Sequence, residues 1–301
     1  MIIRPQRWMA SLLSLMLVLL SFPARAENAP ASEEAIIKES YRTAYDRLIT
    51  VNGKTWVFYA QNNPVMGKAY SRYPDRLRVG DSSCAPTALA NAIVNSVPYE
   101  SIDTIAQLLR RPMRIDSGIV QQYREFATKP KFYPEATCDY FRLLPLVIIN
   151  YAMKNNNSGI TDYRSTQYYP YILDAYGIPY DRNEDVSVCL EEIRDNGAIV
   201  ITCTGTRDSP ISQTVGHFFL LLTVDDEYLY CMDSFVRDEY PLDQKHWIEI
   251  LEPGLFRVKL EDAEKLCLTG SKFIIHPLVQ NQYTEETYRQ IIEESDRLAG
   301  I

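Results

Sequence analysis

The sequence lacks closely spaced cysteines. No C-x-x-C motif occurs among its six cysteines, which are widely separated: Cys84, Cys138, Cys189, Cys203, Cys231 and Cys267. Zinc clusters and thioredoxin-like sites are built on such pairs, so both are disfavoured. Histidine is scarce as well, with three residues in a chain of 301. We therefore expect neither a metal ion nor an organic cofactor.

Basic residues are also fewer than acidic ones. The chain has 31 Lys and Arg against 39 Asp and Glu, which gives a formal net charge of -8 at pH 7. An acidic surface repels the phosphate backbone of nucleic acids and anionic lipid headgroups. The composition therefore argues against both as partners. The hydrophobic share of 46% and the charged share of 23% are those of an ordinary soluble globular protein.

Long apolar runs are missing after the N-terminus, where none reaches the ~20 residues that a spanning helix needs. The N-terminus itself has the parts of an export signal. A basic start with Arg4 and Arg7 precedes an apolar run from Trp8 to Phe22 and a small-x-small site ending at Ala26. We expect residues 1–26 to be a cleaved signal peptide, which predicts a periplasmic or secreted protein without stable membrane insertion. The alternative is an uncleaved anchor.

The rest of the chain divides into three parts by its pattern. Residues 27–55 are predicted to be an N-terminal helical leader, with an amphipathic helix from Glu34 to Ile49. Residues 56–280 are predicted to form the main domain, and residues 281–301 a charged C-terminal helix. A stretch rich in Tyr, Asn and Pro, about 111–170, is predicted to be an insertion or a lobe on the substrate side.

Apolar spacing predicts mostly helices in the first part of the main domain and strands in the second. Helices are expected over residues 84–97, 102–110, 140–154, 168–176 and 186–194. Strands are expected over residues 55–60, 198–202, 217–224, 228–233, 256–260 and 272–276. Helices followed by an antiparallel sheet indicate an α+β fold.

Cys84 stands at the start of a predicted helix, which Ser82 or Ser83 can cap and in which Pro86 suits the first turn. A thiol is a good nucleophile only as the thiolate, and a helix N-terminus lowers its pKa. The unpaired N–H groups of the first turn could also receive an oxyanion. Cys84 is therefore a candidate nucleophile. The alternative is a buried structural cysteine.

His217 is the histidine best placed for chemistry, because it opens a strand directly after a polar loop that contains glycine. A hairpin that turns near Asp225 and Asp226 would bring Asp233 opposite His217 at the open end of the two strands. A carboxylate there could fix the imidazole tautomer. The aspartates of the turn lie about 25 Å away at ~3.3 Å per residue and are worse candidates. The alternative is that Asp233 only ends the strand.

Gln61 follows the predicted strand from Trp56 to Ala60 and comes 23 residues before Cys84. A side-chain amide beside the nucleophile could complete an oxyanion hole with the Cys84 backbone N–H. Asn62 and Asn63 are equally polar neighbours, so the sequence alone does not single out Gln61.

Taken in order, these residues resemble the papain-like peptidases related to the double-glycine (bacteriocin-leader) peptidases, and more closely the stand-alone exported relatives of that group. The resemblance covers about residues 56–240. Its segments are Gln61, then Cys84-Ala85-Pro86-Thr87-Ala88-Leu89-Ala90, Gly197-Ala198-Ile199-Val200, Gly216-His217 and a strand from Tyr228 to Asp233.

The resemblance implies a papain-like cysteine proteinase fold. In that fold a nucleophile at a helix N-terminus packs on an antiparallel sheet. It further implies that Cys84 is the nucleophile, His217 the base, Asp233 the residue that orients the base, and Gln61 the oxyanion-hole donor.

The sequence departs from this group at several positions. Ala85 stands where glycine is usual, Ser234 stands where proline is common, and residues 111–170 have no counterpart. Transporter and ATP-binding regions do not accompany the motif, so double-glycine leaders are not implied as substrates.

The sequence therefore leads to one main hypothesis, which is cysteine-dependent hydrolysis of a peptide or isopeptide amide through an acyl-enzyme on Cys84. The expected partner is a peptide or protein substrate. An acyl transferase or transpeptidase of the same fold is an alternative, and so is a catalytically inactive binding module. A thiol-redox protein is disfavoured because no resolving cysteine lies near Cys84 in the sequence.

Overall fold

The structure is a computed structural model that describes residues 47–62, 79–110, 140–154, 163–213, 216–237, 239–240 and 247–299. The predicted signal peptide, the predicted leader up to residue 46 and much of the predicted insertion lie outside these residues. Cys138 and His246 also lie outside them.

A seven-stranded sheet organises the molecule, and all of its neighbouring strands are antiparallel. In sheet order the strands are β3 (Tyr180–Asn183), β9 (Leu268–Ile275), β4 (Ile199–Thr204), β5 (His217–Val224), β6 (Tyr228–Met232), β8 (Leu255–Lys259) and β7 (Ile248–Glu252). A separate hairpin pairs β1 (Arg47–Val51) with β2 (Lys54–Phe58). The predicted α+β class and the antiparallel sheet are confirmed.

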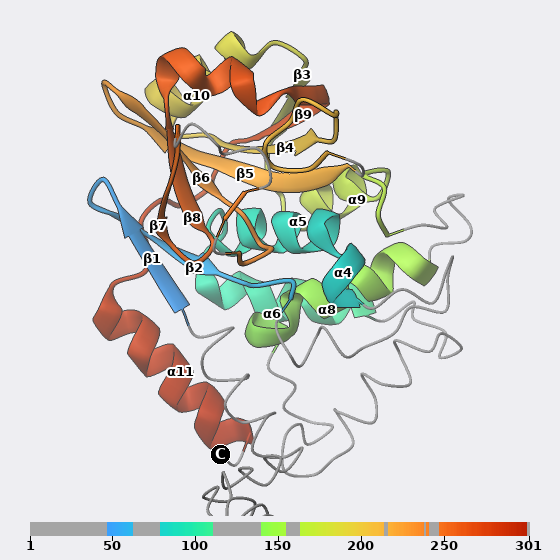
Figure 1. Ribbon diagram of the computed structural model, residues 1–301. Coiled ribbons are helices and arrows are strands. Elements are labelled where there is room, and N and C mark those ends of the chain that lie inside the picture. The colour runs from blue at the N-terminus through green and yellow to red at the C-terminus, as the bar shows by residue number, and fades with distance from the viewer. Residues whose placement is uncertain are drawn as a thin grey trace, which may run out of the picture.

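Helices cover both faces of this sheet (Figure 1). The helix α5 lies along one face, and α10 lies on the opposite face. The helices α6 and α8 pack beyond α5. The helices described are α4 (Val79–Ser82), α5 (Cys84–Val94), α6 (Tyr99–Arg110), α8 (Tyr140–Lys154), α9 (Tyr169–Ala175), α10 (Val186–Asn196), the 3-10 helix η2 (Leu260–Leu266) and α11 (Glu285–Ala299).

Two hydrophobic cores result, one on each face of the sheet. Alternate residues of β5 divide between them, because successive side chains of a strand point to opposite faces. Leu220 and Leu222 pack in the core that contains α5, whereas Phe219 and Leu221 pack in the core on the α10 side.

Most predicted elements are confirmed, within a few residues at their ends. The helix predicted from Glu34 to Ile49 is wrong at its end, because residues 47–51 form the strand β1. The β-branched residues Ile49 and Val51 are buried there, and cross-strand pairing with β2 outweighs the helical spacing. The strands β3 and β7 and the short helices α4 and η2 were not predicted.

The helix α5 is buried on every side except at its first residue. Every residue from Ala85 to Val94 is buried, and many of them are small. Small side chains allow α5 to pack closely between the sheet and α8. The helix therefore fixes the position of Cys84 firmly in the fold.

Two asparagines, Asn91 in α5 and Asn95 at its C-cap, bind the backbone of β2 and of the residue just after it. The side chain of Asn95 accepts from the Val57 N–H at 2.8 Å and donates to the Val57 carbonyl at 2.9 Å. One turn earlier, Asn91 does the same for Tyr59, at 2.7 and 3.1 Å. Each side-chain amide thus makes the two hydrogen bonds that a neighbouring strand would make, because it pairs with one buried N–H and one buried carbonyl. Asn91 therefore fixes the backbone two residues before Gln61.

Replacement of Asn91 by alanine is expected to lower the free energy of unfolding by about 2–4 kcal/mol, because the buried Tyr59 N–H and carbonyl lose their partners. Urea unfolding followed by circular dichroism measures this effect. The control is Asn196→Ala, which removes only an exposed side-chain bond to Glu192 and should change stability by less than about 0.5 kcal/mol. An Asn91→Ala loss as small as that of the control would contradict the structural role.

Among the helices of the described residues, none is long and apolar enough to cross a membrane.

Candidate active site

Cys84 is the first residue of α5 and is partly exposed, while the rest of the helix is buried. Ser83 occupies the N-cap position, but its side chain makes no capping hydrogen bond. The Ala85 N–H stabilises the Cys84 thiolate by a backbone hydrogen bond, and the Phe218 N–H of β5 does the same. The thiol therefore lies between a helix N-terminus and the first residues of a strand.

His217 is the residue that joins Cys84 to the rest of the site. It is the first residue of β5, and only 7% of its surface is exposed. Its Nε2 lies 2.7 Å from Oδ1 of Asp233, a distance at which Nε2 donates its proton to the carboxylate. The hydrogen bond between the His217 and Cys84 side chains therefore falls to Nδ1.

The electrostatics of this pair favour a thiolate beside an imidazolium. Burial alone would raise the pKa of Cys84, but the hydrogen bond and the charge of His217 outweigh it, so the pKa lies below its ordinary value of 9.0. Burial lowers the pKa of His217, but the charge and hydrogen bond of Asp233, together with the contact to Cys84, raise it to about 10. At neutral pH the proton therefore resides on the imidazole.

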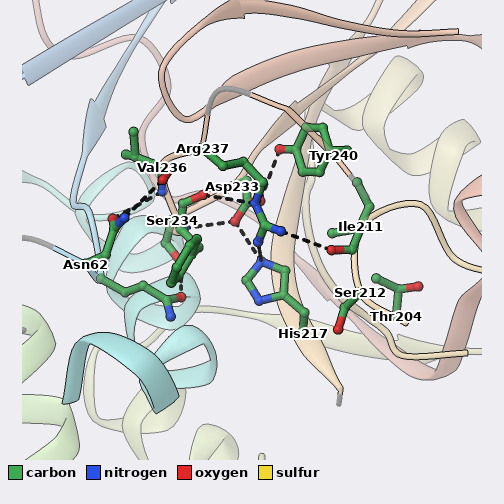
Figure 2. Close-up of polar contacts among 12 residues, drawn as sticks. Asn62, Thr204, Ile211, Ser212, His217, Asp233, Ser234, Val236, Arg237 and Tyr240 are labelled. Carbon is green, nitrogen blue, oxygen red and sulfur yellow. Dashed lines mark hydrogen bonds and ion pairs between the residues drawn. The ribbon is translucent and has the colours of Figure 1, made fainter. Parts of the chain in front are cut away.

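Asp233 is fully buried, accepts three hydrogen bonds and forms an ion pair (Figure 2). Oδ1 accepts from His217 and from the Phe235 N–H at 2.9 Å. Oδ2 accepts from the Tyr240 hydroxyl at 3.0 Å and lies 3.2 Å from Nε of Arg237. Burial raises the pKa of Asp233, but these partners outweigh it and hold the pKa below the usual range. The carboxylate is thus ionised and fixed in orientation.

Gln61 is buried, and its side-chain amide is fixed at both ends. Nε2 donates to the Gly80 carbonyl at 3.0 Å, and Oε1 accepts from the Ser234 hydroxyl at 3.0 Å. Because a carbonyl can only accept, these bonds determine which end of the amide is Nε2. The Gln61 backbone N–H also donates to the Ser234 carbonyl at 2.8 Å. Within the described residues, the second N–H of Nε2 has no protein partner.

Two departures from the resembling group have a clear place in the structure. Ser234, which stands where proline is common, holds both the backbone and the side chain of Gln61. Ala85 is fully buried, and its carbonyl accepts from the Tyr169 hydroxyl at 2.6 Å. The extra methyl group of Ala85 is thus accommodated in the core.

The predicted hairpin of β5 and β6 is confirmed, but its register is shifted by two residues from the one that would place Asp233 directly opposite His217. The proposed turn would pair Leu220 with residue 230, but the structure pairs Leu220 with Met232 and has a bulge between Leu221 and Thr223. His217 and Asp233 are consequently not directly opposite. Their side chains still meet, because Asp233 lies just beyond the end of β6. Asp225 instead accepts from the Tyr228 N–H in the turn.

Sequence reasoning missed two residues of the site, Arg237 and Tyr240, which both contact Asp233. Their positions four and seven residues after Asp233 carry no periodic signal, because this segment is irregular. Sequence reasoning also missed Cys203 of β4, which lies near enough to Cys84 for their charges to interact.

The position of Cys203 bears on the redox alternative. No cysteine lies near Cys84 in the sequence, but Cys203 lies near it in the fold. Burial and the charge of Cys84 nevertheless raise the pKa of Cys203 to about 11. Its thiol is therefore protonated at neutral pH and is a weak attacking group. The structure therefore gives little chemical support to the alternative of a thiol-redox protein.

Among the described residues, no group of three or more His, Cys, Asp or Glu side chains is arranged to hold a metal ion. Comparison of the chain with protein-family models, with curated proteins and with solved structures finds no match. The chemistry of the site itself therefore carries the evidence for what the protein does.

Proposed function

We propose that the protein is a papain-like cysteine peptidase that cleaves a peptide or isopeptide amide through an acyl-enzyme on Cys84. The observation that carries this proposal is the chain of contacts from Cys84 to His217 and on to Asp233, with a His217–Asp233 distance of 2.7 Å. A nucleophile, a base and a group that orients the base occur in that order, as acyl transfer requires.

The reaction begins with attack of the Cys84 thiolate on the carbonyl carbon, which forms a tetrahedral oxyanion. The Cys84 backbone N–H and the second N–H of Gln61 Nε2 stabilise this oxyanion. Protonated His217 then gives its Nδ1 proton to the leaving amine as the C–N bond breaks. Asp233 keeps the imidazole ring in the orientation that this transfer needs.

Water completes the cycle by attack on the thioester. His217, now neutral, takes a proton from the water, and the C–S bond breaks to release the acid and the Cys84 thiolate. The thiolate–imidazolium pair is thereby restored. An amine that takes the place of the water would give a transferase from the same residues.

The sharpest first test is the alkylation of the purified protein by limiting iodoacetamide across pH 5–9, with the modified residue identified by mass spectrometry. We expect Cys84 to react first at pH 7, because its pKa is lowered. Its rate should fall as the pH drops through that pKa, because the thiolate is the reacting form.

The protein contains its own controls for this experiment. Burial raises the pKa of Cys189 and of Cys203 to about 11, and it raises the pKa of Cys231 well above its usual value. These thiols should stay unmodified at pH 7. Failure of Cys84 to react before them would contradict the proposal and favour a binding module.

Substrates can be found by comparing the peptides that the protein releases from a proteome with those released by its Cys84→Ala variant. Peptides released only by the parent protein identify the cleaved bonds. Products that appear only when an amine acceptor is added would indicate transfer in place of hydrolysis.

A further inference from the structure

Arg237 is bound on several sides. Its Nε lies 3.2 Å from Oδ2 of Asp233, and its terminal NH1 group donates to the Ile211 carbonyl at 3.1 Å. Its guanidinium plane lies over the rings of Phe235 and Tyr240, at 4.9 and 5.0 Å from the ring centroids. The side chain is 20% exposed. Such packing fixes the orientation of a planar cation.

The guanidinium also lies beside the imidazole. Its terminal NH2 group is 3.4 Å from Nε2 of His217. Because Nε2 already gives its proton to Asp233, this contact joins two donors and cannot be a hydrogen bond between them. Arg237 and protonated His217 are therefore two cations that share one buried carboxylate (Figure 2).

This arrangement affects how readily His217 releases its proton. A buried aspartate alone would strongly favour the imidazolium. A strongly held proton makes His217 a weak acid toward the leaving amine. A fixed cation on the same carboxylate offsets part of its charge and repels the imidazolium. The residual attraction then orients the ring while the proton remains transferable.

We propose that Arg237 is a positioning residue that holds the Asp233 carboxylate in place and offsets its charge, so that His217 can pass its proton to the leaving group. This inference rests on the proposed function, and it adds a fourth side chain to the path from the thiol. The residue acts through Asp233 and His217 and does not itself take part in bond making.

The titratable and charged groups near His217 come from three parts of the fold. They are Cys84 of α5, Cys203 of β4, and the group that follows β6, namely Asp233, Arg237 and Tyr240. Arg237 is the cation among these side chains. Its replacement should therefore change the titration of His217 in one direction, toward a higher pKa.

The experiment measures the rate of Cys84 alkylation by iodoacetamide from pH 5 to pH 11.5. As the pH increases, this rate should change in two steps. The step at lower pH reports formation of the Cys84 thiolate, and the step at higher pH reports loss of the His217 proton. In the parent protein the upper step is expected near the His217 pKa of about 10. In Arg237→Gln it should move upward by about one unit, because a neighbouring positive charge is lost.

Two further variants separate charge from structure. Arg237→Lys keeps the cation, so its upper step should return to within about 0.3 unit of the parent value. Arg257→Gln is the matched control, because Arg257 also binds a carboxylate, Glu249, and lies over a tyrosine ring, but on the strand β8. Its profile should coincide with that of the parent. Circular dichroism at each pH shows that the variants stay folded.

The outcomes distinguish this inference from the proposed function. An unshifted upper step in Arg237→Gln would overturn the role of Arg237 even if the parent protein cleaves peptides. A shifted step without any cleavage would support the role of Arg237 and contradict the peptidase. Absence of Cys84 alkylation in the folded parent protein would contradict both.

Discussion

Replacement of Cys84 by alanine is expected to abolish peptide cleavage, with a fall in kcat/KM of at least about 10⁴-fold. The thiolate is the atom that forms the acyl-enzyme, and neither His217 nor Asp233 can replace it at the helix N-terminus. The fold should survive, because the α5 residues after Cys84 are buried independently of the thiol. Cleavage of a fluorogenic peptide, chosen from the proteome comparison, measures the effect.

Cys267→Ala is the control for this variant. Cys267 is another partly exposed free thiol, and it lies at the C-terminal end of η2. Its loss should leave kcat/KM within about twofold of the parent value. If Cys84→Ala kept more than about 1% of the parent activity, the acyl-enzyme mechanism would be wrong.

The second large effect is expected for His217→Gln, which should lower kcat/KM by about 10³-fold or more. Glutamine can donate a hydrogen bond to Asp233, but it can neither store nor deliver a proton. The variant should also lose the low pKa of Cys84. Without His217, burial becomes the dominant effect on the thiol, and burial raises its pKa. Cys84 alkylation near pH 6 should therefore slow together with peptide cleavage.

His276→Gln provides a matched comparison, because His276 likewise pairs with an aspartate, at 3.0 Å from Asp181, but outside the site. Its loss should change neither the cleavage rate nor the alkylation of Cys84. Unchanged alkylation of Cys84 near pH 6 in His217→Gln would show that the imidazole does not support the thiolate.

The sequence predicted the parts of the site that depend on local pattern. Cys84 could be located because a helix start has a signature of Ser, Pro and apolar spacing, and the helix does begin there. His217 could be located because a polar loop meets a long apolar strand. These features arise from the periodicity of a single element, which is readable without knowledge of its neighbours.

The remaining parts of the site depend on contacts between distant segments. Ser234 binds Gln61 although 173 positions of sequence separate the two residues, and no local pattern indicates such a pair. A bulge in β5 changes the hairpin register by one residue between Leu221 and Thr223, and a bulge depends on the packing of both strands. Arg237 lies in an irregular segment, where its role follows only from the proximity of Asp233. Tertiary context decided each of these positions.

Asn91 of α5 has a further consequence for the site. The same helix carries Cys84 at its first residue and, through Asn91, binds Tyr59 just before Gln61. Any small displacement of the helix would therefore carry the thiol and the amide together. The separation of the two groups is governed by side-chain bonds and not by the 23 positions of sequence between them. During evolution that stretch could change in length or composition ahead of Gly80, whose carbonyl accepts from Gln61 Nε2, while the thiol and the amide kept their relative positions.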